Sequence, residues 1–393
     1  MPEPALPLFS LPLEGKPLLR ARFLERPNRF LVRCEDTEGG KINAFLPNPG
    51  RLHELLLPDA ALWLIQDVRP GATRATQFTV LAVERDGRPV MLHTHWCNHV
   101  ARLLLESGAV PGLEGARLVR QEVAVGRSRF DFLMRDAEGA MYVEVKSCTL
   151  FGNGVAMFPD AVTERGRRHL LALADIAETG RARAVVLFIV QTPTAQWFMP
   201  DYHTDPAFAR TMLDTRDRVR FLALPVRWDT GLRFQPSRHT LAIPWSYIEE
   251  ESRDRGAYLV VLHLPENRSI AVGGLGTRVF DAGYYTYVGS AMNGLEARMG
   301  RHRRKHKRMH WHVDYLRAAA DLVDILPIRS SVRLECEMAS ALQSLARYAV
   351  PGFGCTDCSC DAHLFYTPES PLSMPRFHQC LQYKRMCTPS AGA

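Results

Sequence analysis

Asp131, Glu144 and Lys146 are the residues whose types and spacing first indicate chemistry. Asp131 lies in the apolar segment FDFLM, and the other two lie in YVEVKS. Side chains two residues apart on a strand share a face, so Glu144 and Lys146 point the same way, together with Tyr142. If the two segments pair as neighbouring strands, Asp131 lies beside them. Two carboxylates and an ammonium group are costly to bury without a binding role.

Metal-dependent hydrolysis of a phosphate ester is the chemistry that fits this group. Carboxylate oxygens suit Mg²⁺ or Mn²⁺, so Asp131 and Glu144 are the predicted metal ligands. Lys146 can orient the attacking water and stabilise charge that develops on the phosphate. The alternative for Glu-x-Lys alone is an ion pair on an edge strand, because this tripeptide is common.

The elements that would position these residues are predicted in the order helix, strand, strand, strand, helix, strand. The six segments, in chain order, are NHVARLLLESG, RLVRQEVAVG, SRFDFLMRD, MYVEVKSCTL, DAVTERGRRHLLALADIAETG and AVVLFIVQ. This order predicts an α/β domain over residues 93–235. Ahead of it, short alternating runs such as RFLVRCE and QFTVLAVER predict a small β barrel or sandwich within residues 1–92.

The spacing D-x12-E-x-K on neighbouring strands resembles the core of PD-(D/E)XK nucleases. Four further words, PNPGRL, SRFDFL, YVEVKSCTL and FPDAVTERGRRHL, occur in order, and residues 1 to about 235 resemble the sugar fermentation stimulation protein A family. The resemblance implies an N-terminal OB-like barrel that binds nucleic acid, followed by a PD-(D/E)XK domain. It implies Asp131 and Glu144 as metal ligands and Lys146 as the residue that positions water.

The same resemblance bears on three other places. Arg129 and Arg165 are candidate contacts to nucleic acid, and a solvated helix face is the alternative for Arg165. The family pattern has an acidic residue in the middle of the first helix, where this chain has Leu103 and Leu104. Glu106 is the nearest acidic residue in that helix.

A second set of residues follows a predicted linker at residues 236–254. The words GAY and YVG, then Arg298 and His302 on one helix face, resemble the GIY-YIG nuclease layout. With HWHVDYL, ECEMA and GFGCTDCSCDAHLFY, residues 255 to about 367 resemble a GIY-YIG-related family of uncharacterised prokaryotic domains, and the predicted domain spans residues 255–370. This resemblance implies a small α/β domain, which leaves residues 371–393 as a tail.

Roles in that second domain follow from the resemblance. Tyr258 or Tyr287 would relay a proton, although either could be a half-buried core residue. Arg298 would clamp the phosphate with two hydrogen bonds, and His302 is a further site residue. Glu335 is preferred to Glu337 as the metal ligand.

The cysteine-rich word offers a structural zinc site. Its spacing C-x2-C-x-C-x2-H predicts that the ligands are Cys355, Cys358, Cys360 and His363. Four ligands within nine residues are cramped, so a distant His310 or His312 could replace one of them. A packed loop without metal is the alternative that the pattern favours.

Residues 301–312 form a basic tract with six Lys or Arg and four His. Lys307 and Arg308 are predicted to contact the nucleic-acid backbone, which adds salt-dependent affinity without sequence preference. A solvated face is the alternative for Arg303, Arg304 and Lys305. In HWHVDYL, alternation predicts a strand with His310 and His312 on one face.

Composition places these motifs in a globular, multidomain α+β protein. The chain has 393 residues, is 46% hydrophobic and has a formal net charge of +7, which favours an anionic partner: DNA, and RNA as a second choice. We expect no signal peptide and no membrane span, and scattered cysteines indicate reduced thiols in the cytoplasm. The predicted function is a metal-dependent nuclease. The alternative is a non-enzymatic DNA-binding protein built on degenerate nuclease folds. Clustered carboxylates favour the enzyme, because a protein that only binds DNA does not need carboxylates that repel phosphate.

Overall fold

The computed structural model describes residues 6–13, 15–66 and 76–388, and it divides into two compact units. The first comprises residues 1–201, 205–245 and 388–393, and the second comprises 202–204 and 246–387. The division after residue 245 falls within the segment predicted as a linker, and helix α4 (Trp245–Glu251) follows Pro244 there. None of the helices in the described parts of the chain is long and apolar enough to cross a membrane.

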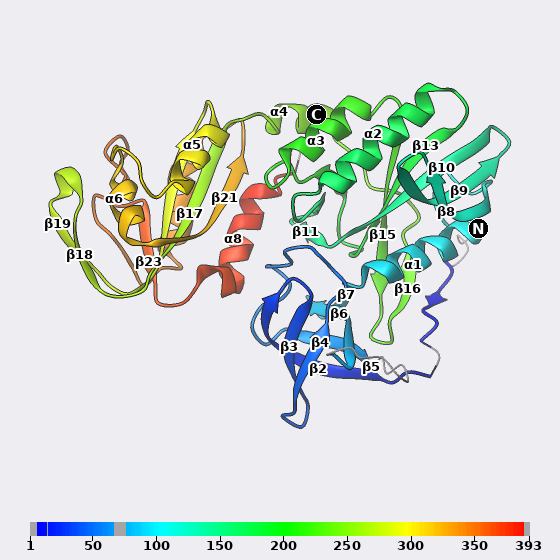
Figure 1. The fold of residues 1–393 in the computed structure, drawn as a ribbon, viewed down its shortest axis with the longest axis horizontal. Helices are drawn as coiled ribbons and strands as arrows, with labels where there is room; N and C mark the ends of the chain where they lie inside the picture. Colours follow the sequence, from blue (N-terminus) through cyan, green and yellow to red (C-terminus); the bar gives the residue numbers. More distant parts are fainter. Residues whose placement is uncertain (1–5, 14, 67–75, 389–393) are drawn as a thin grey trace, which may run out of the picture. The chain divides into compact units, whose positions relative to one another are not determined.

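The N-terminal part of the first unit is a β barrel (Figure 1). Its strands are β2 (Leu18–Asn28), β3 (Leu31–Asp36), β4 (Lys41–Phe45), β5 (Ala61–Gln66), β6 (Phe78–Arg85) and β7 (Arg88–Met91). They lie in the order β4-β3-β2-β5-β6-β7, and parallel pairing of β4 with β6 closes five of them into a barrel. The alternation read from the sequence is visible in β3, where Val32 and Cys34 are fully buried. The predicted barrel is confirmed.

The rest of the first unit is built on a seven-stranded sheet in the order β1-β16-β15-β13-β10-β9-β8. The strands are β1 (Phe9–Ser10), β8 (Arg117–Val125), β9 (Ser128–Asp136), β10 (Gly139–Cys148), β13 (Arg183–Val190), β15 (Arg220–Trp228) and β16 (Arg233–Pro236). Strands β10, β13 and β15 are parallel, and β8, β9 and β10 form an antiparallel meander. A small sheet joins β11 (Leu150–Gly152), β12 (Val155–Phe158) and β14 (Trp197–Pro200).

Helices pack on both faces of this sheet. They are α1 (Thr94–Glu106), α2 (Glu164–Glu178) and α3 (Pro206–Thr215), so the predicted order helix, strand, strand, strand, helix, strand is confirmed by α1, β8, β9, β10, α2 and β13. On β10, Val143 and Val145 belong to the core that includes α1, whereas Cys148 belongs to the core that includes α2. Because side chains alternate along a strand, Glu144 and Lys146 share the α2 face with Cys148.

The second unit has an antiparallel five-stranded sheet in the order β21-β17-β20-β23-β22. The strands are β17 (Gly256–Leu264), β20 (Gly283–Ala291), β21 (Asp321–Arg329), β22 (Tyr348–Ala349) and β23 (Leu364–Thr367), and β18 (Arg268–Ala271) pairs with β19 (Thr277–Phe280) in a separate ribbon. Residues of α5 (Leu295–Arg303) and α6 (His312–Ala319) share one core with the sheet. Residues of α7 (Glu335–Gln343) and α8 (Pro375–Arg385) share the other.

Two predictions for this unit are wrong. Residue 371 does not begin a tail, because α8 buries Phe377 and Leu381, four residues apart, on the α7 side of the sheet. The HWHVDYL word is not a strand, because His312 begins α6. There the Asp314 carboxylate accepts hydrogen bonds from the His310 and Trp311 backbone amides at 2.9 and 3.0 Å. This capping satisfies donors at the helix start and outweighs the alternation of apolar and polar residues.

Candidate functional site

Pairing of β9 with β10 brings Asp131, Glu144 and Lys146 together. The last registered pair is Val143 with Phe132, so Asp131 and Glu144 are the next residues along the two strands. Asp131 Oδ2 accepts a hydrogen bond from the Val145 amide at 2.7 Å. Lys146 Nζ donates to Glu144 Oε1 in an ion pair whose side chains are 15% and 4% exposed. The carboxylates and the ammonium group therefore form one cluster.

Glu144 is the most deeply buried member of this cluster. Its Oε1 also lies 2.5 Å from His169 Nδ1 on α2, so the Nδ1 hydrogen points at the carboxylate. Its Oε2 is buried and has no hydrogen-bond donor among the residues that the structure describes. A buried anionic oxygen without a partner is costly, and a cation is the partner that would satisfy it.

The two carboxylates differ in their affinity for protons. Burial, and then the nearby Glu144 charge, raises the pKa of Asp131 to about 6. Burial also acts to raise the pKa of Glu144, but the hydrogen bond from His169 and the charge of Lys146 outweigh it and hold that pKa below its ordinary value. Glu144 is therefore ionised at neutral pH, and a cation beside Asp131 would relieve the repulsion between the two carboxylates.

Asn98 and His169 complete the surroundings of the carboxylates, and neither was assigned a role from the sequence. Asn98 Nδ2 on α1 donates to Asp131 Oδ1 at 2.7 Å. The sequence could have indicated that His169 is buried, because it lies four residues before buried Leu173 on the apolar face of a predicted helix. Nothing in the sequence indicated a site role for Asn98, since an amide near a helix start is most simply a solvated residue.

The acidic residue of the family pattern has no substitute in α1. Leu104 is fully buried in the core. Glu106 points to Arg102, 3.8 Å away, in a partly exposed ion pair. Asn98, two turns earlier in the same helix, is the side chain that reaches Asp131 instead.

The two predicted nucleic-acid contacts of the first unit are exposed. Arg129 lies 3.5 Å from Glu122 on the neighbouring strand β8. Arg165 is exposed in the first turn of α2, a helix that also positions His169. Their exposure is compatible with contact to nucleic acid and, for Arg165, equally with a solvated helix face.

In the second unit, the tyrosines and His302 are packed together in the core. Tyr258 Oη lies 3.0 Å from His302 Nε2, and the rings of Tyr287 and His302 are 6.3 Å apart. Burial raises the pKa of both tyrosines and lowers the pKa of His302 to about 3. The imidazole is therefore neutral.

The glycine of the YVG motif is required by the same packing. An added Cβ at Gly289 would overlap the Tyr258 phenol, which explains why the motif ends in glycine.

Arg298 and Glu335, which are less buried, are linked through Ser290. Arg298 Nη1 donates to the Ser290 carbonyl oxygen at 3.4 Å, and the Ser290 hydroxyl donates to Glu335 Oε2. The guanidinium of Arg298 also lies over the Trp311 ring, 4.2 Å from its centroid. Glu335 Oε1 is 3.2 Å from His363 Nδ1. Both oxygens of this predicted metal ligand thus have protein partners, and Ser290 was not anticipated.

The prediction for Lys307 is wrong, because its ammonium group forms a buried ion pair within the protein. Lys307 Nζ lies 2.9 Å from Asp314 Oδ1, with 6% of its side chain exposed. Arg301 donates two hydrogen bonds of 2.8 Å to the same carboxylate. Arg308 is exposed, as are the neighbouring Arg303 and Arg304.

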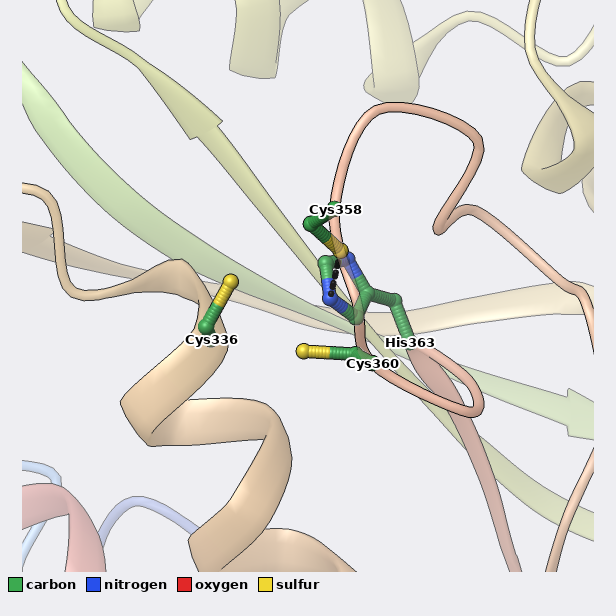
Figure 2. A group of neighbouring side chains, drawn as sticks. All are labelled: Cys336, Cys358, Cys360 and His363. Atoms are coloured by element: carbon green, nitrogen blue, oxygen red, sulfur yellow. Dashed lines mark hydrogen bonds between the residues drawn. The ribbon is translucent and has the colours of Figure 1, made fainter.

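The cysteine cluster also differs from the predicted set. Cys336 on α7, not Cys355, lies with Cys358, Cys360 and His363, and their sulfur and nitrogen atoms are all within 4.8 Å of one another (Figure 2). Cys355 Sγ instead lies 3.5 Å from the Asp361 carbonyl oxygen. His312 Nδ1 accepts a hydrogen bond from the Gly354 amide at 3.2 Å. Sequence spacing missed Cys336 because it lies on a different element, 22 residues before Cys358.

Together, the barrel and the carboxylate-bearing sheet define a multidomain α+β protein with an N-terminal OB domain. Residues 24–92 match the SfsA N-terminal OB domain, and residues 95–231 match the sugar fermentation stimulation protein RE domain. The chain belongs to the sugar fermentation stimulation protein family. Residues 257–385 match a domain of unknown function, DUF123, so the resemblance to GIY-YIG nucleases stays a prediction.

The chain is similar to several sugar fermentation stimulation protein homologues. The sugar fermentation stimulation protein homologue of Moorella thermoacetica is 42% identical over 50% of this chain and 83% of its own length. The homologue of Chloroflexus aurantiacus is 41% identical over 51% of this chain and 76% of its own. The structure of Pyrococcus furiosus SfsA in complex with Ca²⁺ is similar, with a TM-score of 0.52 and 29% identity over 58% of this chain and 96% of that one.

Proposed function

We propose that this chain is a metal-dependent nuclease that hydrolyses phosphodiester bonds in DNA, with its catalytic centre at Asp131, Glu144 and Lys146. The observation that carries the proposal is the buried Glu144 Oε2, which lacks a donor among the described residues and belongs to the same cluster as Asp131. Mg²⁺ or Mn²⁺ held by the two carboxylates would lower the pKa of bound water and stabilise charge on the phosphate.

The protein's own groups would prepare the site. Asn98 and the Val145 amide fix the Asp131 carboxylate, and His169 fixes Glu144. Lys146, paired with Glu144 Oε1, supplies the positive charge that orients the attacking water. The Ca²⁺ complex of the Pyrococcus furiosus relative supports a site for a divalent cation, because Ca²⁺ also takes oxygen ligands. OB domains commonly bind single strands, which supports a nucleic-acid substrate.

The test is cleavage of labelled single-stranded DNA, duplex DNA and RNA by the purified chain with Mg²⁺, with Mn²⁺ and with excess chelator. We expect metal-dependent cleavage that falls by about 10²–10⁴-fold in Glu144→Gln and in Lys146→Ala, as for loss of a positioned catalytic group. Glu138→Gln is the matched control, because Glu138 lies in the turn before β10 and its exposed carboxylate pairs with Arg183 at the surface. Undiminished cleavage by Glu144→Gln would assign the reaction to another site.

A second candidate function, nucleic-acid binding without cleavage, is favoured for the second unit by its exposed basic residues. Arg303 at the end of α5 is exposed, as are Arg304 and Arg308 after it, whereas the Lys307 ammonium group is paired with Asp314. Replacing these three arginines by alanine should weaken binding of a fluorescent oligonucleotide and reduce the salt slope by about 0.9 per lost phosphate contact. The matched control replaces the exposed Arg268, Arg278 and Arg376, which removes the same charge elsewhere in the unit. Equal losses would indicate that net charge, and not this segment, governs binding.

A further inference from the structure

We propose that Cys336, Cys358, Cys360 and His363 bind one structural Zn²⁺ ion. Their ligand atoms are all within 4.8 Å of one another. Around a tetrahedral zinc with Zn–S bonds of ~2.3 Å, neighbouring ligand atoms are ~3.8 Å apart, so small side-chain adjustments complete the site. Three thiolates and one imidazole are a common structural zinc set. The inference concerns the second unit and does not depend on the proposed hydrolysis.

The orientation of His363 favours a metal. Its Nε2 faces the cluster, 3.5 Å from Cys358 Sγ, while its Nδ1 lies 3.2 Å from Glu335 Oε1. The histidine is 1% exposed, so this choice of partners is fixed by packing. A carboxylate beside Nδ1 favours the tautomer that carries its hydrogen there, which leaves the Nε2 lone pair for a metal, and metal-binding histidines typically have such a neighbour.

The carboxylate itself is held in place. Glu335 Oε2 accepts a hydrogen bond from Ser290, which lies on the central strand β20. Glu335 and Cys336 are the first two residues of α7, where the helix dipole favours negative charge. The same helix start therefore provides a ligand that binds as a thiolate and the carboxylate that orients the histidine.

The zinc would join two parts of the second unit that are distant in sequence. Cys336 comes from α7, whereas Cys358, Cys360 and His363 come from the segment between β22 and β23 (Figure 2). Residues 351–363 contain no helix or strand. Backbone hydrogen bonds close the base of this loop, from Gly352 to Asp361 and from His363 to Phe353, both at 2.8 Å. A metal would supply the cross-link to α7 that the backbone does not.

The loop also contacts the tyrosine core. An added Cβ at Gly354 would lie 2.7 Å from Tyr287 Cε2, so the loop backbone packs directly on that ring. Zinc would thus fix the loop against Tyr287 at one end and the Glu335 carboxylate at the other. Metal loss is expected to loosen both contacts.

The experiment measures metal in the full-length chain. Protein purified without chelator should contain one zinc per chain by inductively coupled plasma mass spectrometry. Cys336→Ser, Cys360→Ser and His363→Ala should lose it, whereas His363→Cys, which keeps four ligands, should retain it. Cys355→Ser is the matched control, because Cys355 lies in the same loop but outside the cluster, and it should retain the full zinc content. Glu335→Gln should keep the ion with an affinity lowered about 10–100-fold.

Replacement of zinc by Co²⁺ provides a readout that does not depend on variants that fold poorly. Wild-type protein titrated with Co²⁺ should develop thiolate-to-cobalt charge-transfer bands and the visible bands of a tetrahedral ion. Absence of these bands, together with absence of zinc, would overturn the proposal. So would a Cys336–Cys360 disulfide in the purified protein, or zinc that is retained by Cys336→Ser and lost from Cys355→Ser.

Discussion

Asn98 donates a 2.7 Å hydrogen bond to Asp131, although the two residues come from different elements, helix α1 and strand β9. The contact connects α1 to the carboxylate cluster that β9 and β10 carry. The second oxygen of Asp131 accepts a hydrogen bond from the Val145 amide, so two donors fix the orientation of the carboxylate.

Loss of this hydrogen bond should weaken metal binding. In Asn98→Ala, Asp131 retains one donor and can rotate, so we expect the affinity for Mn²⁺ to fall by about 10–100-fold, as for other residues that orient a metal ligand. Isothermal titration calorimetry measures the affinity directly. Arg102→Ala, one turn further along α1, removes a partly exposed ion pair with Glu106 and a 3.5 Å contact to His99, neither of which touches Asp131, and should bind Mn²⁺ normally. Equal affinities for Asn98→Ala and wild type would remove Asn98 from the site.

Asp314 should be essential for the stability of the second unit. It is fully buried and accepts from Arg301 and Lys307, so Asp314→Ala leaves two cations without their anion. Breaking a buried ion pair in this way costs about 3–5 kcal/mol of unfolding free energy. Urea unfolding measures the loss. The control is Asp321→Ala, whose exposed carboxylate lies 3.6 Å from Lys305 and should contribute about 0–1 kcal/mol. Similar losses in both variants would contradict the role of burial.

Two glycines of the second unit should respond oppositely to alanine. At Gly289 a methyl group would overlap the Tyr258 ring, which is 1% exposed and cannot move away, so Gly289→Ala should destabilise by about 1–3 kcal/mol. At Gly300, within α5, the methyl group meets no atom within 4 Å, and Gly300→Ala should stabilise the helix by about 0.5–1 kcal/mol. Thermal unfolding of the two variants distinguishes them. A stabilising Gly289→Ala would show that the Tyr258 ring can be displaced.

The Glu54 carboxyl group should make the stability of the first unit depend on pH. Burial, and then the Asp160 charge, raises the pKa of Glu54 to about 7 from an ordinary value of 4.5, while Arg85 acts in the opposite direction. The folded state therefore binds this proton more tightly than the unfolded state. Its stabilising contribution is complete below pH 4.5 and is lost as the pH rises to 7.

Glu54→Gln imitates the protonated side chain and should remove this dependence. Relative to wild type, its unfolding free energy should be unchanged near pH 4.5 and higher by up to ~3 kcal/mol at pH 8, which corresponds to a pKa difference of about 2.5. Urea unfolding at several pH values tests this. A constant difference between the two proteins across this range would show that Glu54 has an ordinary pKa in the folded state.

Much of the architecture follows from local sequence patterns. Alternation along β3, the apolar faces of α1 and α2, and Gly108 after α1 each depend on residues close in the chain. The grouping of Glu144 with Lys146 follows in the same way from the period of two along a strand. In HWHVDYL, where alternation predicted a strand, side-chain capping by Asp314 decided for a helix.

The identity of the partners around each cluster was decided only by the tertiary structure. The sequence by itself determined that Asp131, Glu144 and Lys146 could meet, and that Cys358, Cys360 and His363 lie in one loop. Packing of α1 and α2 on the sheet added Asn98 and His169, and packing of α7 replaced Cys355 by Cys336. Spacing along the chain predicts neighbours within one element, whereas contacts between elements depend on how buried side chains fill the space between them.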